Sequence, residues 1–323
     1  ESFEPLNNEE IDLSQPHVMT VLGPIDPGAL GFTLHHEHVF NLTNPLAAGD
    51  DDLVLDDIAN SRLDLDVYFA IGGRSIVDMG PADYGRSVEA MLQIAQHAPV
   101  NIVMVTGHHK HLIAVPCVGN DSVEAITERN LRELREGIDG TDVRAGLIKA
   151  GTSLNEITDV ERRVLEAAAR TQVAFGAPIS THTEQGTMAL EQIEIMAAAG
   201  ADPGRITLCH MDHRLHETEY LIEVLKTGAF ISFDRWTRVQ LASDDERAEV
   251  LLRLADAGYL DQLLVSGDFA RKSNHLGYGA AVGFDYFIDR VPLMLMGAGF
   301  DAPSVRRIFV ENPARMLTIY PVT

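Results

Sequence analysis

Two histidines separated by a single residue are the first side chains in this sequence that could do chemistry. His36 and His38 follow a short apolar run, and residues two apart in an extended chain point to the same side. Both imidazoles can then face one metal ion, because neutral imidazole is a common metal ligand. The same two histidines could also be ordinary polar residues of a loop. The pair by itself therefore does not distinguish a metal site from a polar loop.

Four more polar residues end, or directly follow, apolar runs further along the chain. These residues are Lys149, His182, His210 and Asp268. If the runs are strands of one parallel barrel, all four lie at the carboxyl ends of strands, which line the face where such barrels place their active sites. Taken singly, each histidine could be a satisfied core residue, and the lysine could extend its amine to solvent. Together with the histidine pair, the four residues predict a metal centre.

Lys149 and Asp268 indicate what kind of centre this is. A lysine among apolar residues and metal ions is tolerated only if its charge changes. Reaction of Lys149 with carbon dioxide gives a carbamate, which is anionic and has two oxygens that can bridge two cations. The Asp268 carboxylate, at the end of a strand, needs a cation or a hydrogen-bond network. The set therefore favours two metal ions and an N6-carboxylated Lys149.

The elements that must position these side chains alternate along the chain. Short runs rich in Val, Ile and Leu alternate with longer stretches of helical periodicity, which is the pattern of βα units around a parallel sheet. Eight such runs lie at residues 31–36, 75–79, 102–106, 144–149, 178–182, 206–210, 229–233 and 263–267. We predict an α/β protein with a (β/α)8 TIM barrel, a parallel eight-stranded core and one domain over residues 1–323.

Helices are predicted between these runs, at residues 87–97, 123–137, 160–170, 188–199, 218–227 and 244–257. Thr158 with Glu161, and Ser243 with Glu246, have the capping-box spacing that starts a helix. Glycines at 137, 200, 228 and 258 follow helical patterns, where a left-handed residue ends a helix at little cost.

Composition limits the classes of partner. The formal net charge of -23 disfavours nucleic acid and anionic membrane surfaces, because both require clustered Lys and Arg. Only Cys117 and Cys209 are present, too few for a disulfide framework. No leader opens the chain and no apolar run reaches the roughly 20 residues that span a bilayer, so a cytoplasmic protein is expected, although a leader could have been removed. Because Cys209 precedes His210 on one strand, we expect its side chain to point to the opposite side, into the core.

These motifs together resemble the phosphotriesterase-like family of the amidohydrolase superfamily, over about residues 23–315. The matching segments are VLGPI at 21–25, TLHHEH at 33–38, GLIKAGT at 146–152, THT at 181–183, HMD at 210–212, SGD at 266–268 and ENPA at 311–314.

The resemblance implies a role for each residue. His36, His38 and Asp268 would hold the more buried metal, and His182 and His210 the more exposed one. Carboxylated Lys149 and a hydroxide would bridge the two ions, which are zinc by default, with manganese, cobalt or iron as alternatives. Asp268 would take the proton of the attacking water and pass it to the leaving group. The resemblance also implies a small-molecule substrate and a homodimer.

Several loop residues bear on the substrate. Arg235, Trp236 and Arg271 resemble residues of the lactonase branches, where basic loop residues face an anionic group of the substrate. Each arginine could instead form a surface or supporting ion pair, and Trp236 could pack against the barrel instead of forming a pocket wall. His109 stands where many lactonases have a tyrosine, and it is either a substitute hydrogen-bond donor or part of a solvated loop.

The sequence therefore favours hydrolysis of a lactone, such as a sugar lactone. Hydrolysis of a phosphotriester or an amide is the first alternative, because a metal-activated hydroxide can attack any of these electrophiles. A barrel that binds a ligand without turning it over is the second. Retention of all six predicted metal-site residues argues against that second alternative.

Overall fold

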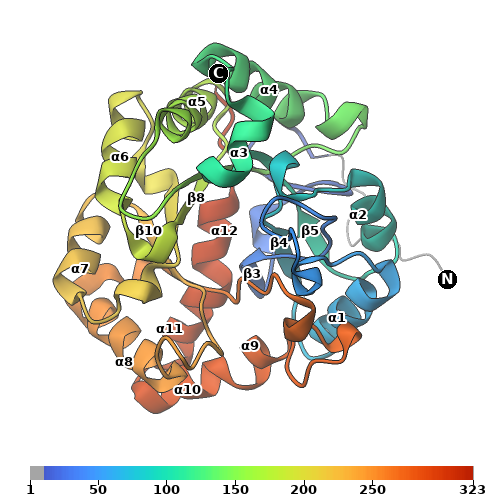
Figure 1. Cartoon of the computed structure of the whole chain (residues 1–323). Coiled ribbons are helices and arrows are strands. Elements are labelled where there is room, and N and C mark those ends of the chain that lie inside the picture. Colours follow the sequence, from blue (N-terminus) through green and yellow to red (C-terminus); the bar gives the residue numbers. More distant parts are fainter. Residues whose placement is uncertain (1–10, 323) are drawn as a thin grey trace.

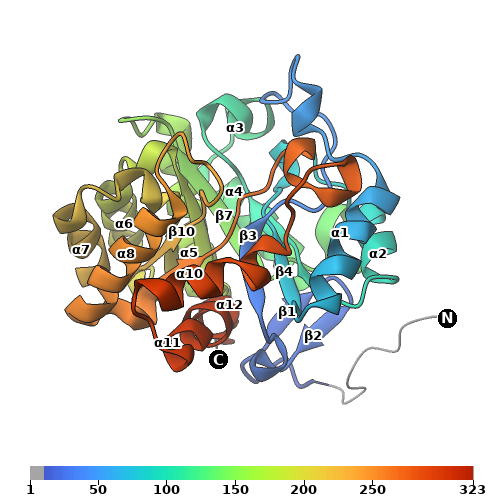
Figure 2. The ribbon, with the colours of Figure 1, turned by 90° about the horizontal axis from the view of Figure 1, so that it is seen from below.

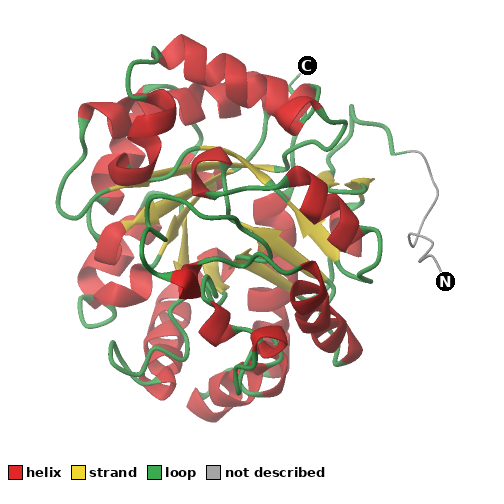
Figure 3. Ribbon diagram, turned by 45° about the vertical axis from the view of Figure 1, so that its right-hand side comes forward, coloured by secondary structure: helices red, strands yellow, loops and turns green. Residues whose placement is uncertain are grey.

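Parallel strands enclosed by helices form the body of the protein. The structure, a computed structural model, describes residues 11–322. Strands lie at the centre and α1, α2 and α4 to α8 surround them (Figure 1), an arrangement that Figure 3 shows by secondary structure. The predicted TIM-barrel fold is confirmed.

The strands of the barrel lie close to the predicted runs. They are β3 (Thr33–Glu37), β4 (Ser75–Asp78), β5 (Asn101–Val103), β6 (Val105–Gly107), β7 (Leu147–Thr152), β8 (Ile179–Thr183), β9 (Ile206–Cys209), β10 (Phe230–Phe233) and β11 (Leu263–Val265). All of their pairings are parallel, in the orders β3-β4-β5 and β6-β7-β8-β9-β10-β11. One predicted strand, at 102–106, is interrupted at Met104 and so forms both β5 and β6.

Single hydrogen bonds connect the sheet β3-β4-β5 with the sheet β6 to β11 at the places where their strands are not paired. The Asp268 N–H donates to the His36 carbonyl at 3.0 Å, and the His36 N–H donates to Ser266 Oγ at 3.0 Å. On the other side, the Gly146 N–H donates to the Met104 carbonyl at 2.9 Å. These bonds bring β11 beside β3, so the first and last strands meet at the residues predicted to bind metal.

The outer helices begin where local signals predict. The helices are α1 (Ile58–Ala70), α2 (Val88–Ala95), α3 (His111–Val118), α4 (Val123–Arg135), α5 (Asp159–Phe175), α6 (Ala189–Ala198), α7 (Thr218–Lys226), α8 (Asp244–Leu254), α9 (Tyr286–Asp289), α10 (Val291–Ala298), α11 (Ala302–Arg306) and α12 (Asn312–Leu317). Both predicted capping boxes are present, at Thr158 for α5 and Ser243 for α8. The four glycines predicted to end helices all have positive φ.

The two ends of the barrel differ. At one end lie the hairpin of β1 (Val18–Thr20) and β2 (Gly23–Ile25), together with α11 and α12, and at the other end lies α3 (Figure 2). The second end carries the carboxyl ends of the parallel strands. Among residues 11–322, no helix combines the length and the apolar character needed to cross a bilayer.

Sequence patterns did not predict α1, because its inward face is not uniformly apolar. Ser61 and Asp64 are buried there beside Leu65 and Tyr68. The Ser61 hydroxyl donates to the Val39 carbonyl at 2.7 Å, and Asp64 accepts backbone N–H groups of a distant loop. Tertiary hydrogen bonds thus replace the apolar stripe by which a helix is recognised in sequence.

Candidate metal centre

Asp268 joins the first two histidines of the predicted set. Its Oδ1 lies 3.4 Å from Nε2 of His36 and 3.3 Å from Nε2 of His38. All three residues are buried, and their ligand atoms lie within 4.8 Å of one another. Burial disfavours the ionised form of Asp268, but Arg235 and the two histidines hold the pKa of this carboxyl well below its usual range. An anionic carboxylate and two imidazole nitrogens are a donor set that suits a divalent metal.

His182 and His210 form the second part of the set. Nδ1 of His182 faces Nε2 of His210 at 2.9 Å, and the His210 ring centroid lies 5.0 Å from that of His36. Nε2 of His182 is buried without a hydrogen-bond partner among the described residues. Burial lowers the pKa of His210 to about 3, so its imidazole is neutral and able to bind metal.

Two residues of the set hold unusual backbone conformations. His210 has φ 65° and Asp268 has φ 48°, both in the left-handed region that residues other than glycine seldom adopt. Such strain persists where the surrounding structure enforces it, often at functional sites. Here it turns each side chain inward as its strand ends.

Lys149 lies on β7, which pairs with the strand that carries His182. It is 1% exposed, and no hydrogen bond or ion pair of Nζ is found within residues 11–322. Burial lowers the pKa of the Lys149 amine, because a charged ammonium is poorly solvated there. Gly107 makes room for this strand, since a Cβ at Gly107 would lie 2.0 Å from the Lys149 carbonyl oxygen. A buried amine without a counter-ion fits the predicted carbamate.

Asp234 contacts the Nδ1 atoms of two histidines of the set. Its Oδ1 accepts from Nδ1 of His210 at 2.7 Å, and its Oδ2 lies 3.3 Å from Nδ1 of His36. One carboxylate thus orients one histidine from each part of the set, as outer-sphere carboxylates do around metal ligands. No role was predicted for Asp234, although its place directly after β10 is the signal that identified the other residues.

Glu37 holds the segment that carries Asp268. Its Oε1 accepts from Ser266 Oγ at 2.7 Å and from the Gly267 N–H at 2.5 Å, and its Oε2 accepts from the Phe269 N–H at 2.9 Å. Burial raises the pKa of this carboxyl to about 8, against the hydrogen bonds that favour its ionised form. Sequence reasoning passed over Glu37, because alternation points it away from the two histidines that flank it.

Two arginines reach Asp268 from the loop after β10. Nη1 of Arg235 forms an ion pair with Oδ2 of Asp268. Nη2 of Arg238 donates to the Asp268 carbonyl at 3.1 Å and lies 3.6 Å from its Oδ2. Arg235 therefore lies at the centre and forms an ion pair there, the alternative that the sequence left open, while its contact with substrate stays a prediction. Arg238 is an additional residue for which no role was predicted.

His109 and Tyr84 also line the centre. The ring of His109 lies 4.5 Å from that of His182, and the ring of Tyr84 lies 4.8 Å from that of His38. The Lys110 N–H donates to Nδ1 of His109 at 2.7 Å, which leaves its hydrogen on Nε2 when the ring is neutral. His109 is 7% exposed, so it belongs to the centre and not to a solvated loop.

Three expectations are corrected. Trp236 is fully buried in the main core, with its indole N–H bound to the Phe233 carbonyl, so it forms no accessible pocket wall. Arg271 is engaged by Asp50 and Asp52, at 2.8 and 3.3 Å, instead of being free for a substrate. The Cys209 side chain does not point away from the centre.

The position of Cys209 follows from the turn at His210. Its Sγ lies within 4.8 Å of ligand atoms of His36 and Asp234, and 3.1 Å from Ser180 Oγ. Because His210 leaves the strand with a left-handed φ, the alternation of sides fails between these two residues. Cys209 is buried, as expected, but beneath the centre.

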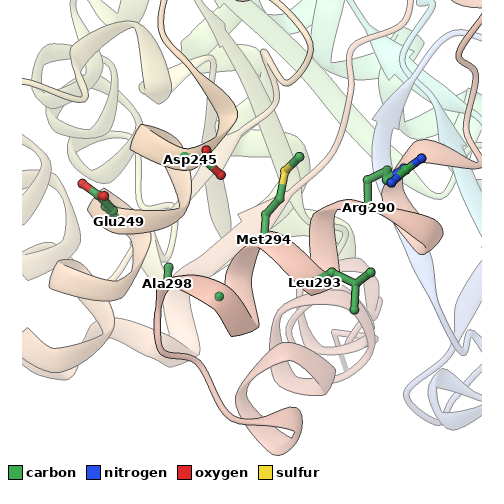
Figure 4. Close-up of a pocket in the computed structure, with 7 residues that line it drawn as sticks. Asp245, Glu249, Arg290, Leu293, Met294 and Ala298 are labelled. Carbon is green, nitrogen blue, oxygen red and sulfur yellow. The ribbon is translucent and has the colours of Figure 1, made fainter.

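A pocket on the outer surface is separate from the centre. Asp245 and Glu249 of α8, Arg290, and Leu293, Met294, Gly297 and Ala298 of α10 line it (Figure 4). None of the predicted site residues contributes to this pocket, so it offers them no route to a substrate.

Comparisons with known proteins show what the chain is similar to. The sequence model of the phosphotriesterase family matches residues 16–317. A lactonase from Listeria monocytogenes has a similar structure, with 36% identity, a TM-score of 0.89, and coverage of 94% of this chain and 99% of that one. A phospho-furanose lactonase of Mycoplasmopsis agalactiae is 31% identical over 93% of this chain and 91% of its own length. An N-acetyltaurine hydrolase of Danio rerio is 29% identical over 93% and 97%.

Proposed function

The chain is a hydrolase of the phosphotriesterase family, and from this we propose that it opens the ring of a small lactone, such as a sugar lactone, at a centre of two divalent metal ions. The observation that carries the proposal is that five buried donors of the predicted set lie close together near the strand ends: His36, His38, His182, His210 and Asp268. The sixth, Lys149, is buried on β7, which pairs with the strand that carries His182.

The described residues fit two metals. His36, His38 and Asp268 would hold one ion, and His182 with His210 the other, with carboxylated Lys149 between them. The unpartnered Nε2 of His182 and the unpaired Lys149 amine support this assignment, because buried polar atoms normally have partners. Two such cations, zinc by default, would lower the pKa of a water molecule and polarise the carbonyl under attack.

The remaining steps fall to the protein's own groups. Asp268 accepts the proton of the attacking water, since its carboxylate is ionised, and delivers it to the ring oxygen when the carbon–oxygen bond breaks. Arg235, paired with Oδ2 of Asp268, holds that carboxylate in place and is able to donate to the substrate. Asp234 and Glu37 keep the histidines and Asp268 oriented.

Both the relatives and the loops favour a lactone. The Listeria and Mycoplasmopsis proteins are named as lactonases, and the segment after β10 reads Asp234-Arg235-Trp236, like the lactonase branches of the family. The Arg235 and Arg238 guanidiniums suit a lactone that carries a phosphate or carboxylate.

Hydrolysis of an amide is the second candidate. The relative from Danio rerio is named as an N-acetyltaurine hydrolase and aligns over 93% of this chain. An amide is a weaker electrophile with a poorer leaving group, so it would demand more of the proton delivery by Asp268.

The test is a comparison of turnover by the zinc-loaded protein. Sugar lactones, phosphorylated sugar lactones, homoserine lactones, N-acyl amino acids including N-acetyltaurine, and a paraoxon-like triester are assayed side by side. We expect a lactone to give the highest kcat/KM, at or above about 10⁴ M⁻¹s⁻¹. Absence of lactone turnover, with efficient hydrolysis of an amide or triester, would refute the lactone assignment.

A further inference from the structure

Tyr84 comes from a loop that the sequence analysis did not connect with the chemistry. It ends the short 3-10 turn Ala82–Tyr84 between β4 and α2, close to the carboxyl end of β4. Its ring lies 4.8 Å from that of His38 and stacks on that of His109 at 5.6 Å, with 20° between the planes. His109 in turn lies 4.5 Å from His182. Tyr84 therefore borders both parts of the metal centre.

The backbone fixes the position of this ring. The Tyr84 N–H donates to the Pro81 carbonyl at 2.9 Å, and the Leu42 N–H donates to the Gly85 carbonyl at 2.7 Å. Gly85 has φ 79°, and a Cβ there would lie 2.1 Å from the Leu42 carbonyl oxygen, so only glycine permits this close approach. Tyr84 itself is 4% exposed. A ring held in this way is preorganised for contact with a ligand.

The Tyr84 hydroxyl is unusual because it has no hydrogen-bond partner among the described residues. A buried tyrosine usually finds a hydrogen-bond partner for its hydroxyl. Within residues 11–322 none is found for Tyr84, and its oxygen is not among the fully enclosed polar atoms, so it keeps some access to solvent although the residue is buried. The Tyr84 ring packs against His38, whose Nε2 lies 3.3 Å from Oδ1 of Asp268, so Tyr84 borders the side of the centre where the proton-carrying carboxylate lies. A ligand at the centre would be its natural partner.

We propose that the Tyr84 hydroxyl donates a hydrogen bond to the ring oxygen of the lactone as the acyl carbon–oxygen bond breaks. This inference rests on the proposed function. Water forms the new bond to the acyl carbon, the ring oxygen leaves with the electron pair, and the proton that water gave to Asp268 ends on that oxygen. Tyr84 keeps its own proton throughout and stabilises the negative charge until the transfer is complete. The product is the hydroxy acid.

The test compares two substitutions of the same kind. Tyr84→Phe removes the hydroxyl and keeps the ring. Tyr220→Phe on α7 is the matched control, because that hydroxyl serves only to accept the Ala189 N–H at 3.2 Å in the outer layer. Both variants are loaded with zinc, checked for equal metal content, and assayed on lactones and on aryl esters of the same acyl group.

The role predicts a dependence on the leaving group. With a lactone, whose leaving group is a strongly basic alkoxide, Tyr84→Phe should lower kcat by about 10²-fold. With a nitrophenyl ester, whose leaving group needs little help, the loss should be less than about threefold. Tyr220→Phe should match the wild type on both. An equal loss on both substrates would mean that Tyr84 only shapes the site, and no loss on either would show that its hydroxyl is not used; both results overturn the proposal.

A binding measurement gives a readout that does not depend on turnover. Calorimetric titration with the ring-opened hydroxy acid should give a dissociation constant roughly 2- to 10-fold weaker for Tyr84→Phe, the value of one hydrogen bond. An unchanged constant would contradict the contact. If the wild type hydrolyses no lactone at all, the proposed function fails, and that outcome is distinct from a wild type that is active together with an equally active Tyr84→Phe variant.

Discussion

Asp234 binds His210 through two donors at once, accepting its ring Nδ1–H at 2.7 Å and its backbone N–H at 3.0 Å. The same carboxylate lies 3.3 Å from Nδ1 of His36. Because these contacts hold both rings by Nδ1, with Nε2 turned toward the centre, we expect Asp234→Asn to weaken zinc binding by about 10- to 100-fold. Competition with a chromophoric chelator measures this affinity. Unaltered zinc affinity in a folded variant would show that Asp234 does not orient the ligands.

The second prediction concerns the contribution of Glu37 to the stability of the fold. Each of its oxygens accepts a hydrogen bond from a donor beside Asp268, and a glutamine in its place turns one oxygen into an NH2 group that faces a donor. Glu37→Gln should therefore lower the free energy of unfolding by about 1–3 kcal/mol, the cost of one buried unsatisfied group. Chemical denaturation of the metal-free protein, at a pH above the raised pKa of this carboxyl so that both oxygens are acceptors, is the measurement. Equal stability of the variant would remove Glu37 from this role.

Replacement of Lys149 tests whether this residue carries a carbamate that bridges two metal ions. Lys149→Ala removes the buried amine that would carry the carbamate, so we expect loss of activity and of bound metal. A short carboxylic acid such as propionate can occupy the space and bridge two cations, so high concentrations should restore part of the activity. The thermal unfolding temperature of the variant controls for misfolding. Full activity without added acid would refute the bridging role.

Asp64 predicts a pH dependence away from the centre. It accepts the Leu276 and Gly277 N–H groups, and it lies near His275 at 3.8 Å and near the like charge of Asp285. Burial raises its pKa to about 6, against about 3.9 in an unfolded chain. At a pH between these two values, Asp64 is therefore protonated in the folded state and ionised in the unfolded state.

The sign of this linkage is opposite to that of a salt-bridged carboxylate. The stabilisation is present below about pH 4 and is lost as the pH rises through about 6, a change of about 2–3 kcal/mol. An asparagine does not titrate, so Asp64→Asn should not lose this stability. As the pH rises through this range, the unfolding free energy of the wild type should fall relative to that of the variant. A difference independent of pH would contradict the shifted pKa.

The strands could be predicted from the sequence, and the same rule selected the six candidate metal-site residues, whose role as ligands stays a prediction. Runs of Val, Ile and Leu mark buried parallel strands, and a polar residue directly after such a run lies at the active face. Lys149, His182 and Asp268 were found in this way. Their mutual contacts, such as the one between Asp268 and His38, follow from the closure of the barrel.

What the sequence could not predict depends on backbone turns and on distant partners. The left-handed φ of His210 brings Cys209 under the centre, against the alternation of a regular strand. Trp236 packs inward because its N–H finds the Phe233 carbonyl, and Arg271 pairs with Asp50 and Asp52 more than 200 positions away. Tyr84 gave no local signal, since its importance lies in its contacts with His38 and His109.

The most direct test of the account is the metal content of the purified chain. After reconstitution with zinc and bicarbonate and removal of free metal, elemental analysis should give about two zinc ions per chain, and about none in the Lys149→Ala variant. Two zinc ions in the wild type would support the carbamate-bridged centre. A folded wild type that retains one ion or none would contradict it.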